Sequence, residues 1–134
     1  MRLFIPEDSM KTRRVFSIAN NHYSLIQYCP DLFRAEAVNV GLVVMCAKPA
    51  MVRVRLTSTF KRACDWFGIT DPDLVNLKLA TDAIRCRIEK LETPEDLFAF
   101  ASTRANDLRL TKPRFAKIQD VDSDFERLFA QLVD

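Results

Sequence analysis

The densest group of polar side chains lies between two strand-like segments of the chain, at Arg34, Glu36, Asn39 and Gly41. Arg34 and Glu36 are two residues apart, so in an extended chain they share a face and can form a charge-assisted hydrogen bond. Asn39 interrupts an apolar segment, and a buried amide without a hydrogen-bond partner costs about 1–3 kcal/mol. We therefore expect Asn39 to bond polar backbone or a ligand, and Gly41 to mark a bulge or a close backbone approach.

Two roles for this group of residues remain open. They form either a structural clasp that pins the preceding loop to the sheet, which is the interpretation we favour, or the wall of a binding or catalytic pocket. The two roles differ in where the side chains point. A clasp turns Arg34, Glu36 and Asn39 toward other protein atoms, whereas a pocket turns all three into one open hollow.

The residue types fit three common kinds of enzyme or metal site poorly. A nuclease of the PD-(D/E)-x-K kind would use Pro30-Asp31, but Cys46-Ala47-Lys48 lacks the second carboxylate. A cysteine nucleophile needs a histidine base, and His22 is the only histidine in the chain. The segment Asp120-x-Asp122-x-Asp124 opens like a calcium loop, yet the glycine and the glutamate that such a loop requires are missing. We predict no catalytic residue, no metal and no cofactor.

The cysteine spacing and the start of the chain bear on the compartment. Cys29, Cys46, Cys64 and Cys86 form no C-x-x-C pair that would clip a zinc ion, so we expect reduced, buried thiols that pack as small hydrophobic groups. The apolar stretch at residues 1–5 is too short for a secretory signal. No uncharged apolar run reaches the roughly 18 residues of a membrane-spanning helix, so a cytoplasmic protein is expected.

Charge is distributed unevenly along the chain, although the net charge of +2 is too small to indicate a nucleic-acid-binding protein. Residues 1–67 carry ten basic and five acidic side chains, while residues 68–134 carry ten and thirteen. A basic sheet face with aromatic rings is typical of proteins that bind single-stranded RNA. The alternatives are a solvated outer sheet face and an acidic protein partner. The candidates for the basic face are Lys11, Arg13, Arg14, Arg53 and Arg55, with Tyr23 or Tyr28 as stacking rings.

Period-two alternation predicts three strands in the first half of the chain, over His22–Cys29, Ala37–Ala47 and Met51–Thr57. The last two form a hairpin, and Phe16–Ile18 would add a short edge. In the middle strand we place the even-numbered residues from 38 to 46 on one face and the odd-numbered Val43 and Met45 on the other. In the third strand, the apolar residues face inward and the two arginines face outward.

From Ser58 onward, spacings of three and four residues predict helices. Ser58 caps the first, over Phe60–Phe67, and Gly68 ends it in the left-handed conformation. The next two begin at Asp71-Pro72 and Thr93-Pro94, each of which is a capping side chain followed by a proline. The longer of these carries an apolar stripe that would pack on the sheet, at Leu77, Ala80, Ile84, Ile88 and Leu91, with Arg85 and Glu89 paired outside.

The end of the chain returns to alternation before a last helix. Residues 108–118 alternate, but Pro113 confines them to an edge or splits them. Ser123 and Glu126 form a capping box that opens the last helix, which closes the core. Together the elements predict an α+β protein with an antiparallel sheet of about four strands and helices packed mainly on one face. We expect one domain over 1–134, with residues 1–15 as a candidate flexible arm.

The segment from His22 to Tyr28, the pair Pro30-Asp31 and the element R-x-E-x-x-N-x-G at residues 34–41 resemble a bacterial family described as domain of unknown function 3037. The segment 110–114 is similar to the end of that family. Ala35 departs from the glycine that many members carry. The resemblance implies a small bacterial domain, encoded in some genomes beside kinase-like genes related to HipA toxins or on mobile elements, and it implies no established activity.

We therefore expect a non-enzymatic protein-interaction or regulatory accessory module of a bacterial mobile-element or toxin-linked locus. Its partner would be a protein, and its oligomeric state is open. The alternative is a nucleic-acid-binding or processing protein that uses the basic strand face together with Arg34, Glu36 and Asn39.

Overall fold

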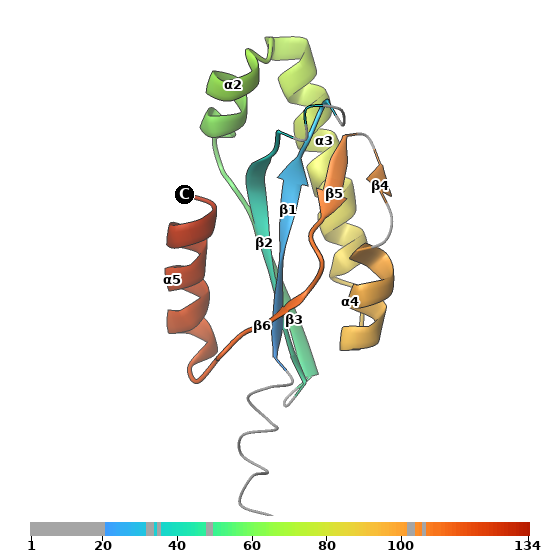
Figure 1. Ribbon diagram of the computed structural model, residues 1–134, viewed down its shortest axis with the longest axis vertical. Coiled ribbons are helices and arrows are strands. Elements are labelled where there is room, and N and C mark those ends of the chain that lie inside the picture. The colour runs from blue at the N-terminus through green and yellow to red at the C-terminus, as the bar shows by residue number, and fades with distance from the viewer. Residues whose placement is uncertain (1–20, 32–33, 35, 48–49, 102–103, 106) are drawn as a thin grey trace, which may run out of the picture.

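The computed structural model describes the chain except residues 1–20, 32–33, 35, 48–49, 102–103 and 106 (Figure 1). The predicted arm at 1–15, the edge at Phe16–Ile18 and the basic residues Lys11, Arg13 and Arg14 lie outside the described residues. The elements follow in the order β1 (His22–Tyr28), β2 (Val38–Ala47), β3 (Ala50–Leu56), α2 (Lys61–Phe67), α3 (Asp71–Ile88), α4 (Pro94–Ala101), β4 (Arg104–Ala105), β5 (Leu108–Leu110), β6 (Arg114–Phe115) and α5 (Val121–Leu132).

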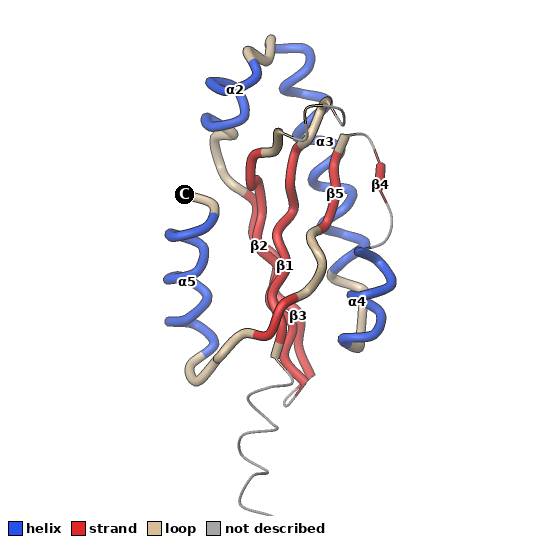
Figure 2. Tube along the Cα trace, viewed as in Figure 1, coloured by secondary structure: helices blue, strands red, loops and turns tan. Residues whose placement is uncertain are grey.

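The strands form one antiparallel sheet in the order β3-β2-β1-β5-β4, with β6 also paired to β1. The three long strands match the predicted ones, and the predicted α+β class is confirmed. The alternating segment 108–118 is split into β5 and β6 on either side of Pro113, which has no N–H to donate to the ladder. Both short strands lie against β1, which therefore occupies the centre of the sheet (Figure 2).

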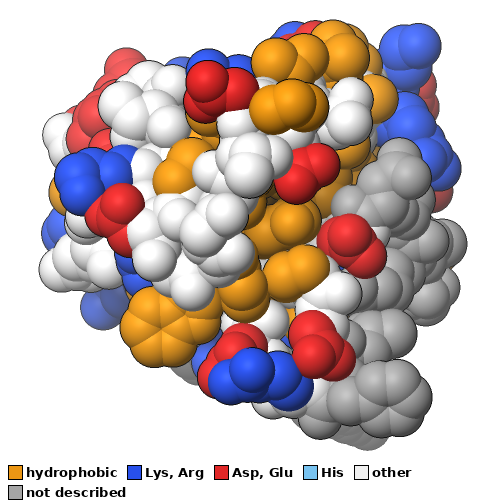
Figure 3. All heavy atoms as spheres, turned by 90° about the horizontal axis from the view of Figure 1, so that it is seen from above, with side chains coloured by type: hydrophobic (Ala, Val, Ile, Leu, Met, Phe, Trp, Pro, Cys, Tyr) orange, Lys and Arg blue, Asp and Glu red, His pale blue; other side chains and the backbone are white. Residues whose placement is uncertain are grey.

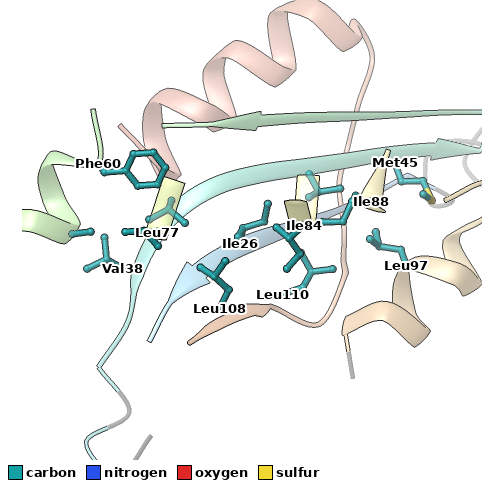
Figure 4. Close-up of a cluster of buried hydrophobic side chains, with 13 residues drawn as sticks. Ile26, Val38, Met45, Phe60, Leu77, Ile84, Ile88, Leu97, Leu108 and Leu110 are labelled. Atoms are coloured by element: carbon teal, nitrogen blue, oxygen red, sulfur yellow. The ribbon is translucent and has the colours of Figure 1, made fainter. Parts of the chain in front are cut away.

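Among the described helices, α2, α3 and α4 cover one face of the sheet and form a three-helix layer, and α5 covers the opposite face (Figure 1). The larger hydrophobic cluster packs α2, α3 and α4 on the sheet through buried side chains that include Phe60, Leu77, Ile84, Ile88 and Leu97 (Figure 4). A second cluster packs α5 on the opposite face through Phe125 and Phe129. The described helices thus lie mainly on one face of the sheet, as predicted, and the last helix, α5, forms a separate layer on the opposite face.

A β-bulge in the middle of β2 changes which residues face each layer. Ile26 pairs with Gly41 and Gln27 with Asn39, so Val40 is an extra residue in β2. Val38 and Val40 therefore face the three-helix layer, whereas Leu42, Val44 and Cys46 face α5. The prediction of one continuous even-numbered face was wrong, because strict alternation cannot register an inserted residue.

Gly41 lies at this bulge, where the chain packs too tightly for a side chain. A Cβ at Gly41 would lie 3.0 Å from Cδ1 of Ile26 and from Cδ2 of Leu56. The carbonyl oxygen of Arg55 would be only 3.2 Å away. Both parts of the sequence expectation for Gly41, the bulge and the close approach, are confirmed.

Three predicted helix caps are wrong. The residue before α2 is Phe60 rather than Ser58, with φ 54° in the left-handed region, because the buried Phe60 ring fixes the entry of this helix. Helix α3 begins at Asp71 itself and is preceded by Thr70. Helix α5 begins before Ser123, which donates from its hydroxyl to Oδ2 of Asp120 at 2.6 Å.

The other helix signals are confirmed. Gly68 ends α2 with φ 62° and donates its N–H to the carbonyl of Cys64 at 2.8 Å. The hydroxyl of Thr93 accepts from the N–H of Asp96 at 3.1 Å, which caps the start of α4. Arg85 and Glu89 pair at 2.9 Å on the outside of α3, and the predicted stripe packs inward.

The cysteine expectation holds only in part. Cys29 and Cys46 are buried, Cys64 is half-buried and Cys86 on α3 is exposed. Cys86 lies off the apolar stripe, so nothing in the packing of α3 covers it. Among the described helices, none combines the length and the apolar character that crossing a bilayer requires.

Replacing Gly41 with alanine is expected to lower the free energy of unfolding by about 1–3 kcal/mol, because the new methyl group overpacks the bulge. Urea denaturation measures the change. Leu56→Ala removes one of the two clashing side chains, so the double variant should be less damaged than the sum of the single variants by at least ~0.5 kcal/mol. Additive effects would show that the close approach at Gly41 is not what excludes a side chain.

Candidate functional site

The side chain of Asn39 on β2 joins the neighbouring strand β1 and the last helix by hydrogen bonds. Its Nδ2 donates to the carbonyl oxygen of Leu132 at 2.8 Å. Its Oδ1 accepts from Nε2 of Gln27 at 2.9 Å, and Oε1 of Gln27 in turn accepts from Nε of Arg109 at 2.9 Å. The chain of bonds runs from β5 through β1 and β2 to the end of α5.

The bulge explains why Asn39 reaches α5. Val38 and Val40 point to the three-helix layer, so Asn39 between them points to the opposite layer, beneath the last turn of α5. The last carbonyl groups of a helix have no intrahelical partner. Asn39 supplies one for Leu132, so the predicted polar partner of this amide is backbone rather than a ligand.

Arg34 and Glu36 form the predicted pair, but away from Asn39. Nη2 of Arg34 donates to Oε2 of Glu36 at 3.2 Å, with side chains 68% and 37% exposed. The pair lies in the loop before β2, which begins only at Val38. The bonds of this pair and those of Asn39 share no residue, so the structure does not gather the three side chains into one hollow.

The two arginines of β3 lie beneath α5 rather than facing solvent alone. Arg53 pairs with Asp122 at 2.7 Å, and Arg55 donates to both carboxylate oxygens of Glu126, at 2.8 and 2.5 Å. Both guanidinium groups also lie over the ring of Phe125, with Cζ 5.5 and 5.2 Å from its centroid. Their positive charge is thus compensated within the chain.

The candidate stacking rings lie on opposite faces of the sheet. Tyr23 packs with the α5 layer, whereas Tyr28 packs with the three-helix layer and meets Phe67 edge-on at 5.4 Å. Only Tyr23 therefore shares a face with Arg53 and Arg55. The described residues do not form a continuous basic face with two stacking rings.

His22 is a buried core residue. Its ring contacts Phe98 at 5.5 Å and Phe115 at 4.8 Å between centroids. Cys46 faces the α5 layer, on the other side of the sheet from the His22–Phe98 contact. Nδ1 of His22 and the hydroxyl of Ser24 are buried without a hydrogen-bond partner among the described residues, and no hollow among those described is lined by either.

Besides a hollow of about 180 Å³ whose lining includes Asn39, Lys61 and Arg62, two larger surface hollows open at the end of the sheet where β1 ends and β2 begins. The larger, about 620 Å³, lies against α3 and is lined by Tyr28, Asp73, Asn76, Leu77, Leu79, Ala80, Ala83 and Asp107. The other, about 420 Å³, is lined by Ala37, Val38, Arg62, Asp65 and Trp66. Tyr28 and Val38 are paired across the strands, so the hollows are neighbours. Viewed from this end, hydrophobic side chains gather in the middle, with both acidic and basic side chains around them (Figure 3).

Large apolar side chains are exposed beside these hollows. Trp66 on α2 is 66% exposed, and Val75 and Leu79 on α3 are 56% and 66% exposed. Sequence reasoning missed these residues because it sought polar chemistry and followed only the buried stripe of α3. A usable signal was present, since Val75 and Leu79 are four residues apart and lie off that stripe.

The phenol of Tyr28 lines the larger hollow and is influenced by two carboxylates. Burial raises the pKa of the Tyr28 phenol above its usual value of 10.0, and the carboxylates of Asp107 and Asp73 raise it further. The phenol therefore stays protonated and can donate or accept a hydrogen bond. The described residues contain no group of three histidine, cysteine, aspartate or glutamate side chains placed to hold a metal ion.

A family model described as Protein of unknown function (DUF3037) matches residues 23–133. The matched region holds all the described strands and helices except the first residue of β1. It includes the R-x-E-x-x-N-x-G element and the C-terminal segment on which the resemblance rests. No curated protein and no solved structure matched the chain.

Asn39→Ala is expected to lower the free energy of unfolding by about 2–3 kcal/mol, because it leaves the Gln27 amide and the Leu132 carbonyl without partners. Asn39→Asp should be nearly as harmful, since its carboxylate would face the Leu132 carbonyl oxygen. Glu36→Gln, at the exposed pair with Arg34, should change the value by less than ~0.5 kcal/mol. Equal effects of Asn39→Ala and Glu36→Gln in urea denaturation would contradict the structural role of Asn39.

The contribution of the Arg55–Glu126 pair to stability is expected to disappear in acid. The hydrogen bond from Arg55 holds the pKa of Glu126 below its usual value of 4.5. Because the pKa of Glu126 is lower in the folded chain than in the unfolded chain, its carboxylate stabilises the fold at pH values above 4.5. This stabilisation is lost as the pH falls through the lowered pKa of the folded state. Glu126→Gln should therefore be less stable than the natural chain at about pH 7, with the difference shrinking toward about pH 3. A difference that stays constant with pH would overturn this assignment.

Proposed function

The chain belongs to the family Protein of unknown function (DUF3037), and we propose that it is a cytoplasmic, non-enzymatic protein-interaction module. The observation that carries the proposal is the exposure of Trp66, Val75 and Leu79 around two neighbouring hollows. Exposed apolar clusters mark interaction sites on soluble proteins, and tryptophan is enriched among the residues that dominate binding energy.

The distribution of polar contacts also favours an interaction module. Asn39 is engaged with Gln27 and Leu132, and Arg34 with Glu36, so the side chains best suited to chemistry make contacts within the chain. A catalytic constellation needs side chains that converge where a substrate can sit. The two larger hollows are lined mainly by apolar side chains, with acidic residues in both and Arg62 in one.

The compensated charges make nucleic acid a weaker candidate partner. Arg53 and Arg55 would have to leave Asp122 and Glu126 before they neutralised phosphates. The resemblance that places family members beside HipA-like kinase genes or on mobile elements suggests a regulatory or accessory role in such a locus. The partner is then expected to be a protein encoded nearby.

Co-purification of the tagged protein from its native locus tests the proposal. A specific protein should be enriched with the natural chain and reduced about tenfold or more by the double change Trp66→Ala and Leu79→Ala. Glu95→Gln on α4, an exposed change outside the hollows, is the matched control and should leave recovery unchanged.

Circular dichroism must show that the double variant keeps its fold and melting temperature. Recovery of the tagged protein alone would refute the proposal. So would a partner recovered equally with the natural chain and the double variant. A gel shift with RNA that weakens steeply with salt and depends on Arg53 and Arg55 would favour a nucleic-acid-binding protein instead.

A further inference from the structure

We propose that the outer face of α3 is a self-association surface, on which α3 of a second copy of this chain packs antiparallel about a two-fold axis at Leu79. The inference rests on the proposed function, because Val75 and Leu79 belong to the interaction surface described there. It names a second copy as the occupant of that part of the surface and leaves Trp66 on α2 for a different protein.

Helix α3 carries apolar residues on two opposite sides. The inner side packs in the larger hydrophobic cluster through Leu77, Ile84 and Ile88, which are buried. At about 100° per residue, these three lie roughly 140–180° around the helix from Leu79, which is 66% exposed. Since a helix that is hydrophobic on all sides is normally buried, the second apolar side of α3 is expected to be covered as well.

The outer apolar residues form one stripe that is symmetrical about Leu79. Its members are Pro72, Val75, Leu79, Ala83 and Cys86, all of them exposed. They follow one another at spacings of three and four residues, so they share one face of the helix. The four outer members lie seven and four residues on either side of Leu79. A two-fold axis at Leu79 therefore places apolar residues of the two copies opposite one another, as a self-complementary interface requires.

The charges at the two ends of α3 fit an antiparallel pair. The first turn is acidic, with Asp71 and Asp73, and the last turn carries Arg85 and Arg87. An antiparallel second copy brings the acidic first turn of each helix beside the basic residues of the other and opposes the helix dipoles. A parallel copy would bring like charges together at both ends, so charge favours the antiparallel arrangement.

Asp73 and Arg87 are the charged residues best placed to pair between the copies. Arg85 is already paired within its own helix, whereas Arg87 and Asp73 are exposed. The carboxylate of Asp73 accepts from the Thr70 hydroxyl at 3.2 Å, and it has about four acceptor positions, so it can accept further bonds. At about 100° per residue, Asp73 and Arg87 lie on the same flank of the outer stripe, so the antiparallel pair brings them side by side.

Sedimentation equilibrium of the intact chain tests the proposal. One pair of helices about 27 Å long buries less surface than a stable complex, so the apparent mass should rise from one copy to two between about 1 and 300 μM. Leu79→Glu places two like charges on the axis and should weaken association about tenfold or more. Trp66→Ala, an exposed change outside the stripe, is the matched control and should leave association unchanged.

Circular dichroism must show that both variants keep their fold. A chain that stays monomeric at about 300 μM overturns the proposal. So does a Leu79→Glu variant that associates as well as the natural chain, because the interface then lies elsewhere.

Disulfide cross-linking tests the antiparallel register. The two copies of residue 79 meet at the axis, so Leu79→Cys should form a disulfide-linked dimer on mild oxidation. The two copies of Cys86 lie about 21 Å apart along the helices, beyond the roughly 7 Å that a disulfide allows between Cα atoms. The natural chain should therefore not cross-link through Cys86. Cross-linking at Cys86, or its failure in Leu79→Cys, overturns the antiparallel pair.

A charge reversal tests the contact between Asp73 and Arg87. Asp73→Lys and Arg87→Glu should each weaken self-association about tenfold, because each variant brings like charges together at both contacts. An equimolar mixture of the two variants restores opposite charges at both contacts, so it should associate about as well as the natural chain. A mixture that associates no better than either variant alone overturns the contact.

The native partner separates this inference from the proposed function. A dimer that is lost with Leu79→Glu, together with a specific partner that is lost with Trp66→Ala, supports both. A monomeric chain whose partner is lost with the double change at Trp66 and Leu79 leaves the interaction module standing and refutes self-association. A dimer that co-purifies with no other specific protein refutes the proposed function and supports self-association.

Discussion

The arrangement of the described chain depends on one extra residue in β2. Because Val40 is inserted opposite β1, the even-numbered Val38 and Val40 face the three-helix layer, whereas the even-numbered residues after Gly41 face the α5 layer. The same shift turns Asn39 toward α5, where it bonds the carbonyl of Leu132. Even-numbered residues of one strand thereby contribute to both hydrophobic clusters, which they could not do if β2 alternated strictly along its length.

Local patterns were sufficient for most elements of the fold. Hydrophobic periodicity predicts the three long strands and α3. The position of Gly68 after an apolar helix predicts that it ends this helix. The helix starts were harder, because several Ser, Thr and Asp side chains compete for each cap and tertiary packing decides between them. At Phe60, burial of an aromatic ring outweighed the capping preference of Ser58.

The candidate site could be predicted only where the type of a single residue indicates that it needs a partner. Asn39 in an apolar strand demands a partner, but the partner lies 93 residues away along the chain. The sequence also shows that Arg53 and Arg55 are positively charged. Their acidic partners, however, lie on α5, 69 and 71 residues away along the chain. No periodicity links such positions, so the sequence alone could not predict that α5 covers this face of the sheet and pairs with its arginines.

Arg53 and Arg55 form ion pairs with α5, so the distribution of charge along the sequence does not describe the charge on the surface of the folded chain. By sequence, the first half is basic and the second half acidic. In the folded chain, acidic residues of α5 form ion pairs with the basic residues of β3. Charge pairing inside a fold, rather than the balance of the sequence, decides which surface attracts which partner.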